Sequence, residues 1–99
     1  MATDTYEKLE TVFPKIVKLM SEDIFDSHEF ILVLAQEYQK LYIEALYVYR
    51  DKSRPFHAVH MAIGKRLKKR VDLVTHIRFR HSNNIFGEKN RVAVWQKVK

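Results

Sequence analysis

Residues 55–70 read PFHAVHMAIGKRLKKR and place five cationic side chains in their last six positions. Successive side chains of a helix lie about 100° apart, so residues three or four apart share a face. The stretch therefore predicts an amphipathic helix. Its buried stripe comprises Phe56, Val59, His60, Ile63 and Leu67. The opposite, mainly basic face carries His57, Ala58, Met61, Ala62, Lys65, Lys68 and Lys69.

The charge of the chain is divided unevenly between its two halves. Residues 1–49 hold four Lys or Arg and nine Asp or Glu, a net charge of −5. Residues 50–99 hold fourteen Lys or Arg and three Asp or Glu, a net charge of +11. A basic surface concentrated on one side of a small protein attracts polyanions. The same lysines also complement the dipole of helix 55–70 at its C-terminus, which is a purely structural alternative.

Length and composition predict a single domain over residues 1–99. A chain of 99 residues with 46% hydrophobic residues, two Gly and two Pro suits one compact, helix-rich core. The absence of cysteine excludes disulfides and cysteine-ligated zinc. No basic leader with an apolar run opens the sequence, and no stretch of 18 uninterrupted apolar residues occurs. We therefore expect a cytoplasmic protein without a membrane partner.

Two further helices are predicted in the acidic half. The first begins at Asp4 or Thr5 and extends to about Met20, with a kink at Pro14 or a break that lets Pro14 open a second short helix. The second begins after Asp26, because Asp26 and Glu29 have the spacing of a capping box. Its apolar pattern continues to about Arg50, which gives one rod about 36 Å long. We expect Gly64 to permit close approach of this long helix.

The C-terminal third has the two-residue period of strands. Val71, Leu73, Ile77 and Phe79 alternate with mostly polar residues, and residues 91–98 form a second β-favouring run. Residues 81–90 between them are rich in turn formers, so the two runs predict a hairpin. Ile85 and Phe86 are expected to fold back from its loop onto the core, and Trp95 is expected to pack inside. The predicted fold class is α+β, mainly helical: three helices followed by a C-terminal β-hairpin.

This order of elements resembles the winged helix-turn-helix architecture. The resemblance implies that residues 57–69 act as the recognition helix. It also implies a wing that contains Asn83, Asn84, Lys89, Asn90 and Arg91. Two features depart from the family: the second helix is about twice the usual length, and the link to the third helix is longer than a tight turn. These departures favour contact with the nucleic-acid backbone over reading of base edges.

The leading hypothesis is a small nucleic-acid-binding protein that acts on duplex DNA in gene regulation, either alone or as a homodimer. A helix in a major groove needs small or hydrogen-bonding residues near the bases and cations near the phosphates. The candidate contacts are His57, Ala58, Met61, Lys65, Lys68, Lys69, Arg78, Arg80, Lys89 and Arg91. A cationic strand face also prevents edge-to-edge aggregation, and the same surface would serve RNA, so neither alternative is excluded.

No enzymatic site, metal site or cofactor is predicted. The chain has no glycine-rich phosphate loop and no acid/base set, and His57 and His60 fall on different faces of their helix. The alternative function is a protein-interaction module. In that case helix 27–50, rich in tyrosine, pairs with a second copy or another chain, and the basic half faces an acidic partner.

Overall fold

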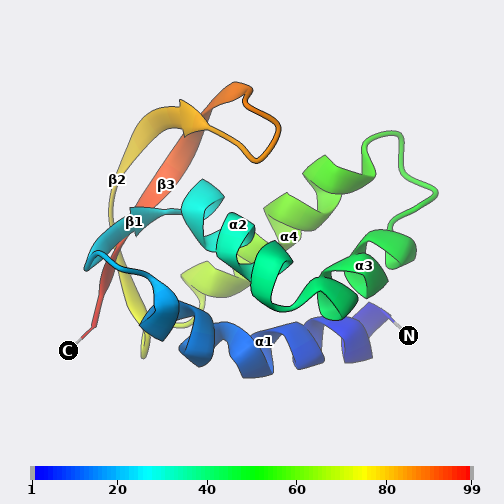
Figure 1. Cartoon of the computed structure of the whole chain (residues 1–99), viewed down its shortest axis with the longest axis horizontal. Helices are drawn as coiled ribbons and strands as arrows, with labels where there is room; N and C mark the ends of the chain where they lie inside the picture. The colour runs from blue at the N-terminus through cyan, green and yellow to red at the C-terminus, as the bar shows by residue number, and fades with distance from the viewer. Residues whose placement is uncertain (1, 99) are drawn as a thin grey trace.

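The structure is a computed structural model that describes residues 2–98, with the side chains of residues 5–98. Within this range it is an α+β fold, about half helical, with four helices and a three-stranded antiparallel sheet. The elements are α1 (Ala2–Leu19), β1 (Ile24–Asp26), α2 (Ser27–Glu37), α3 (Gln39–Val48), α4 (Pro55–Lys68), β2 (Val74–Asn83) and β3 (Lys89–Lys97), as Figure 1 shows. The predicted class is confirmed, whereas the predicted count of three helices is wrong. No described helix combines the length and the apolar character needed to cross a bilayer.

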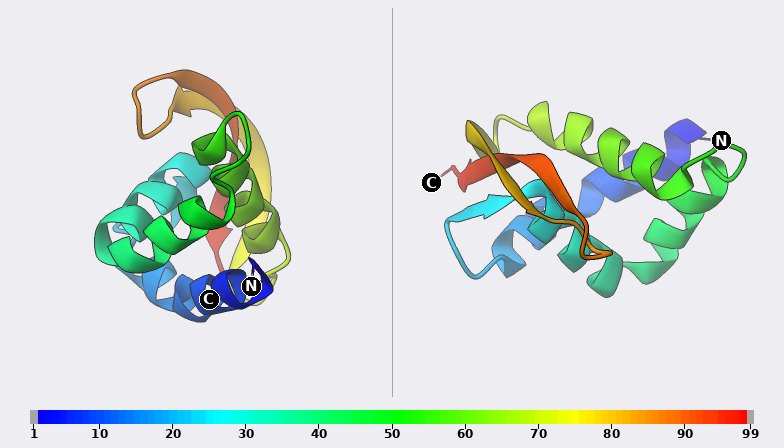
Figure 2. Two further views of the ribbon diagram at one scale, coloured as in Figure 1. Left: turned by 90° about the vertical axis from the view of Figure 1, so that its right-hand side faces the viewer. Right: turned by 90° about the horizontal axis from the view of Figure 1, so that it is seen from above.

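The sheet lies along one side of the helices (Figure 1). Its strand order is β1-β3-β2, so β3 is the central strand and pairs with both neighbours. The predicted hairpin is confirmed as β2 and β3. It is strongly curved, and its connection reaches over the helical layer (Figure 2). The concave side of the hairpin therefore faces α4.

The core lies between the sheet and the helices. Phe13 of α1 meets Phe30 of α2 edge to face, with ring centroids 5.1 Å apart, and Phe25 of β1 stacks on the same Phe30 at 6.2 Å. All three rings are fully buried. Trp95 of β3 is buried as well, and its Nε1 donates a hydrogen bond of 2.8 Å to Ser27 Oγ, so the packing role expected for Trp95 is confirmed.

Helix α1 continues through Pro14, so the predicted break does not occur. A proline inside a helix lacks the N–H that would reach the carbonyl four residues earlier, here that of Glu10. Arg70 supplies the missing donor: its Nη1 lies 3.3 Å from the Glu10 carbonyl oxygen. A side chain from the end of α4 thus compensates for the proline.

The predicted helix 27–50 is two helices, which meet at Tyr38. Tyr38 has φ −130° and ψ 57°, outside the helical region, although neither Gly nor Pro occurs nearby. The break turns α3 so that Tyr42 and Ala45 are buried and the rings of Tyr49 and Tyr6 lie 5.7 Å apart. Packing against α1 and α4 therefore overrides the local preference for a straight helix.

The corner between β1 and α2 carries the capping box that the sequence predicts. The Glu29 backbone N–H donates to Asp26 Oδ1 at 2.9 Å, and the Asp26 N–H donates to Glu29 Oε1 at 3.0 Å. Asp26 is only 1% exposed. Its Oδ2 also accepts hydrogen bonds from Nε and Nη2 of Arg80, at 3.1 and 2.8 Å. Burial alone would raise the pKa of Asp26, but these hydrogen bonds and the Arg80 charge lower it.

Strand β2 begins at Val74, three residues later than predicted, and contains a bulge at Ile77 between the pairs His76–Trp95 and Arg78–Val94. The late start leaves Val71 77% exposed. The bulge puts Phe79 on the same face of the sheet as His76, where it is 51% exposed instead of buried as predicted. The connection is a compact turn in which the Asn84 side chain accepts hydrogen bonds from the N–H groups of Phe86 and Glu88. Gly87 in this turn has φ +81°, a conformation that glycine adopts readily.

Candidate nucleic-acid interface

Three buried residues fix the orientation of α4. Val59, Ile63 and Leu67 are fully buried, as the predicted stripe requires. His60 is half-buried beside them, and Phe56 is 42% exposed at the start of the helix. With this stripe against the core, one flank of α4 turns towards the concave side of the hairpin.

A groove separates this flank of α4 from the hairpin. We call it the α4–hairpin groove; its volume is about 760 Å³. Helix α4 contributes Phe56, His57, His60, Met61, Gly64, Lys65 and Lys68 to its wall. The hairpin contributes His76, Phe79, Asn84, Phe86, Glu88, Asn90, Arg91, Val92, Ala93 and Trp95. Ser27, His28 and Ile31 of α2, together with Arg54 and Pro55, complete the lining.

Aromatic contacts close one end of the groove. Phe86 in the hairpin connection meets Phe56 of α4 edge to face, with centroids 4.9 Å apart, and lies 6.4 Å from the ring of His60. Ile85 next to it packs against the core, which confirms that this part of the loop folds back. Phe86 itself remains 54% exposed. The connection is therefore held over the first turn of α4.

The hairpin wall of the groove presents an aromatic ring next to a cation. The Arg91 guanidinium carbon lies 4.2 Å from the centroid of Phe79, and the ring of His76 lies 4.7 Å from Phe79 on another side. Phe79 is half-exposed in this position. The bulge at Ile77 places Phe79 in this position, because it shifts the alternation of β2 by one residue.

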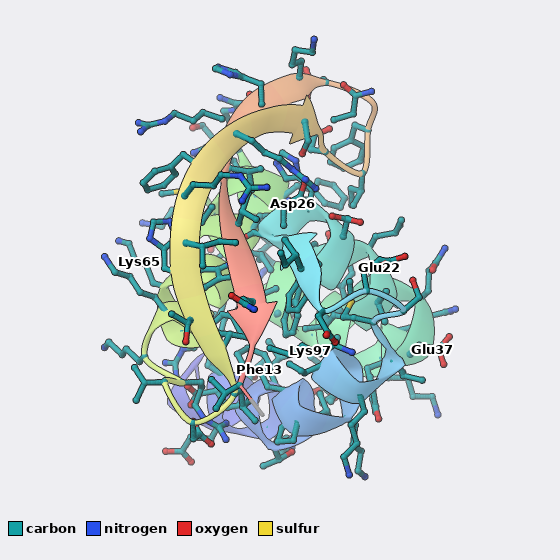
Figure 3. All side chains as sticks on the ribbon, turned by 90° about the vertical axis from the view of Figure 1, so that its left-hand side faces the viewer. Phe13, Glu22, Asp26, Glu37, Lys65 and Lys97 are labelled. Carbon is teal, nitrogen blue, oxygen red and sulfur yellow. The ribbon has the colours of Figure 1, made fainter. Side chains whose placement is uncertain are left out.

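The groove is cationic. Its lining contains Arg54, Lys65, Lys68 and Arg91 but one carboxylate, that of Glu88. Among the described side chains, these four cations form no ion pair, whereas Arg66, Arg70 and Arg80 are each paired with an acid. Figure 3 shows Lys65 beside β2, at the edge of the sheet opposite β1 and Asp26. Cations of α4 and of the hairpin that form no ion pair are thus brought together where α4 faces the hairpin.

Two of the histidines that line the groove, His28 and His60, do not add to this charge at neutral pH. Burial, with smaller contributions from the nearby His28 and His57, lowers the pKa of His60 to about 4. Its Nε2 shares a hydrogen bond of 2.7 Å with the hydroxyl of Tyr42, whose own pKa burial raises to about 12. Burial also lowers the pKa of His28, whose Nδ1 lies 2.8 Å from Ser82 Oγ. His60 and His28 are therefore neutral at pH 7.

The groove brings together half of the residues predicted to contact nucleic acid. His57, Met61, Lys65, Lys68 and Arg91 line it. Ala58, Lys69, Arg78, Arg80 and Lys89 are not in the lining. Arg80 forms ion pairs with Asp26 and Glu29, and Arg78 lies on the same face of β2. Ala58 and Lys69 lie on the flank of this helix that faces away from the groove. The contacts predicted on the helix therefore do not all belong to one surface.

Sequence reasoning missed the aromatic part of the groove and the position of Gly64. The sequence pattern predicts Phe79 inside the core and Gly64 in close contact with the long second helix. A methyl group placed on Gly64 would meet no atom within 4 Å, so no neighbouring helix requires glycine there. Among the side chains of residues 5–98, no cluster of three or more metal-ligating groups is present. The chain matches no protein-family model, no curated protein and no solved structure, and its function must therefore be inferred from the chemistry of the α4–hairpin groove.

Proposed function

We propose that this protein binds nucleic acid through α4 and the β2–β3 hairpin, with duplex DNA as the first substrate to test. The observation that carries the proposal is the gathering of unpaired cations in one place. Among the described side chains, Lys65, Lys68 and Arg91 line one groove without an ion-pair partner, whereas Arg66, Arg70 and Arg80 are each paired with an acid.

Unpaired cations are the groups that phosphates recognise. Each contact between a lysine or arginine and a phosphate releases a condensed counterion, which supplies most of the free energy of nonspecific binding. An arginine that already holds a buried carboxylate, as Arg80 holds Asp26, would have to give up that interaction first. Among the described side chains, Lys65 and Lys68 form no ion pair, so they can contact a phosphate without giving one up.

The order of elements supports a winged-helix interpretation of this surface. A helix, a short strand, further helices and a hairpin follow one another, β1 lies beside β3, and α4 directly precedes the hairpin. By the resemblance noted above, α4 corresponds to the recognition helix and residues 83–91 to the wing. The hairpin curves over α4 (Figure 2) and faces the flank that carries Lys65 and Lys68, which favours phosphate contact over base reading.

Fluorescence anisotropy with a labelled mixed-sequence duplex at two salt concentrations tests the proposal. The logarithm of the affinity should fall with the logarithm of salt by about 0.9 for each phosphate neutralised. The double variant Lys65→Glu/Lys68→Glu should abolish binding without unfolding the protein. The matched control, Lys15→Glu/Lys18→Glu, makes the same charge change on exposed positions of α1 and should bind measurably. Absence of binding to any nucleic acid at low salt would rule the proposal out.

A second candidate function is self-association through α3. Ile43 and Tyr47 lie one turn apart and are 61% and 63% exposed, and the Arg50 guanidinium carbon lies 4.0 Å above the Tyr47 ring. Tyr42 does not belong to this surface, because it is buried against His60. Sedimentation equilibrium of the wild type and of Ile43→Glu/Tyr47→Glu tests this function: a dimer that the double variant dissociates supports it, and a monomeric wild type excludes it.

A further inference from the structure

The α4–hairpin groove has the size of a small-molecule site. Its volume of about 760 Å³ lies within the range of about 300–1,000 Å³ found for such sites. A duplex is read differently, by a helix that protrudes into a major groove about 12 Å wide. Here the hairpin stands across from the flank of α4, and Phe86 touches Phe56 at one end. Whatever enters this groove must be thinner than a duplex.

We propose that the groove binds a single-stranded segment of nucleic acid, with bases on its aromatic wall and phosphates on its lysines. This inference rests on the proposed function and narrows it to a substrate. Single strands are held by cationic grooves that carry exposed aromatic rings, because every base offers a face for stacking. The α4–hairpin groove combines both features.

Exposed aromatic rings mark the positions for the bases. Phe79 is 51% exposed and Phe86 54% exposed, and both belong to the groove lining. Arg91 lies against one side of Phe79 and extends the stacking surface, since bases stack on guanidinium planes as well as on rings. Met61, 51% exposed on α4, adds an apolar contact on the opposite wall.

The two lysines of the groove lie towards the opposite end of α4 from the contact between Phe56 and Phe86. Lys65 and Lys68 lie in the last turns of α4, whereas the contact between Phe56 and Phe86 is at its first turn. Glu88, the carboxylate of the lining, belongs to the hairpin connection near Phe86. A strand would therefore place phosphates near Lys65, Lys68 and Arg91 and would keep them away from Glu88.

Gly64 is an independent sign that something approaches the wall of α4. Glycine inside a helix is less stable than alanine, and here no neighbouring side chain needs the space. Gly64 nevertheless lies in the groove lining between Met61 and Lys68. Its bare backbone leaves room for a flat group, such as a base or a sugar, against α4.

Charge and shape together favour nucleic acid over an acidic protein segment. An acidic peptide would satisfy the lysines, but it would leave the exposed parts of the Phe79 and Phe86 rings uncovered. A nucleotide strand satisfies both kinds of group at once. A polyglutamate peptide is therefore included in the test as the competing occupant.

Fluorescence anisotropy of the full chain with four labelled probes tests the inference. The probes are a 12-nucleotide single strand made as DNA and as RNA, the corresponding 12-base-pair DNA duplex, and polyglutamate. Either single strand should bind more tightly than the duplex and the peptide at equal salt. Phe79→Ala should weaken single-strand binding by about tenfold and leave duplex binding nearly unchanged. The matched control Leu19→Ala, at a position 53% exposed outside the groove lining, should bind like the wild type.

Gly64→Leu provides a second variant, because leucine is a good helix former and projects into the groove. It should keep or raise the thermal midpoint and weaken single-strand binding by about tenfold or more. If the duplex binds and the Phe79 and Gly64 variants bind single strands as the wild type does, the groove is not the site and only the broader proposal survives. Equal binding of polyglutamate, unaffected by Phe79→Ala, overturns the inference in favour of an acidic partner. If no nucleic acid binds at low salt, both proposals fail.

Discussion

The hydroxyl of Tyr42 on α3 and Nε2 of His60 on α4 lie 2.7 Å apart, and this hydrogen bond ties α3 to the helix that forms one wall of the groove. His60 is neutral in the folded protein at pH 7 because burial lowers its pKa to about 4. An unfolded chain would have the ordinary value of about 6.5. The difference makes the stability of the protein depend on pH.

The free energy of unfolding should fall as the pH is lowered from 7 to 5. Between pH 6.5 and 4 the unfolded chain binds a proton at His60 that the folded protein does not, so stability is complete above pH 6.5 and declines towards pH 4. Because the ring is only half-buried, we expect a loss of about 1–2 kcal/mol. Urea denaturation at the two pH values measures it. His60→Gln should remove part of the dependence and leave the part that His28 contributes, and identical stability at both pH values would contradict the assignment.

Replacing Asp26 should be among the most damaging single changes. Asp26→Ala removes the cap of α2 and leaves Arg80 without its buried partner. We expect a loss of about 3 kcal/mol in the free energy of unfolding, measured by urea denaturation. Asp72→Ala, which breaks the exposed ion pair with Arg70, is the control and should have a far smaller effect.

The Arg70 guanidinium should matter more when Pro14 is present than when it is absent. Arg70→Met leaves the Glu10 carbonyl without a donor, while Pro14→Ala restores the helical N–H that can reach that carbonyl. A double-mutant cycle should therefore show Arg70→Met to be less harmful by about 1 kcal/mol in the Pro14→Ala background. Additive effects would mean that Arg70 does not compensate for the proline.

Gly64→Ala should stabilise the protein. The new methyl group meets no atom within 4 Å, and alanine is favoured over glycine inside a helix by about 0.5–1 kcal/mol. For a chain of this length that corresponds to a rise of roughly 2–8 °C in the melting temperature, which calorimetry measures. A lower melting temperature would show that the backbone of α4 depends on glycine in a way that its surroundings do not reveal.

Lysines inside and outside the groove should differ in the salt dependence of binding. Lys65→Gln and Lys68→Gln should each reduce the magnitude of the log–log slope for a DNA single strand by up to about 0.7. Lys69→Gln removes the same charge from a position outside the groove lining and should leave the slope close to that of the wild type. Equal effects at all three positions would indicate a diffuse field instead of contacts in the groove.

Features determined by nearby residues could be read from the sequence. The capping box needs only Asp26 and Glu29, and the buried stripe of α4 follows from helical spacing. The hairpin follows from two β-favouring runs and the turn formers between them. Each of these depends on interactions within a few residues or on a simple period.

Features determined by distant partners could not be predicted in this way. The break at Tyr38 has no Gly or Pro signal and depends on the burial of Tyr42 against α4. Strand β1 is three residues long, too short to show a period, and exists because it pairs with β3. The bulge at Ile77 moved Phe79 out of the predicted core and into the groove. This is why the cationic half of the candidate site was predicted and its aromatic half was not.

The central position of β3 has a consequence for the synthesis of the protein. Both neighbours of β3 precede it in the chain, so neither β1 nor β2 has a pairing partner until residues 89–97 have emerged from the ribosome. Until then the Asp26–Arg80 link has no completed sheet to support it. The pairing of β1 with β3 joins segments far apart in the sequence, and such pairings form slowly. The nascent chain therefore acquires its helices first and its groove last.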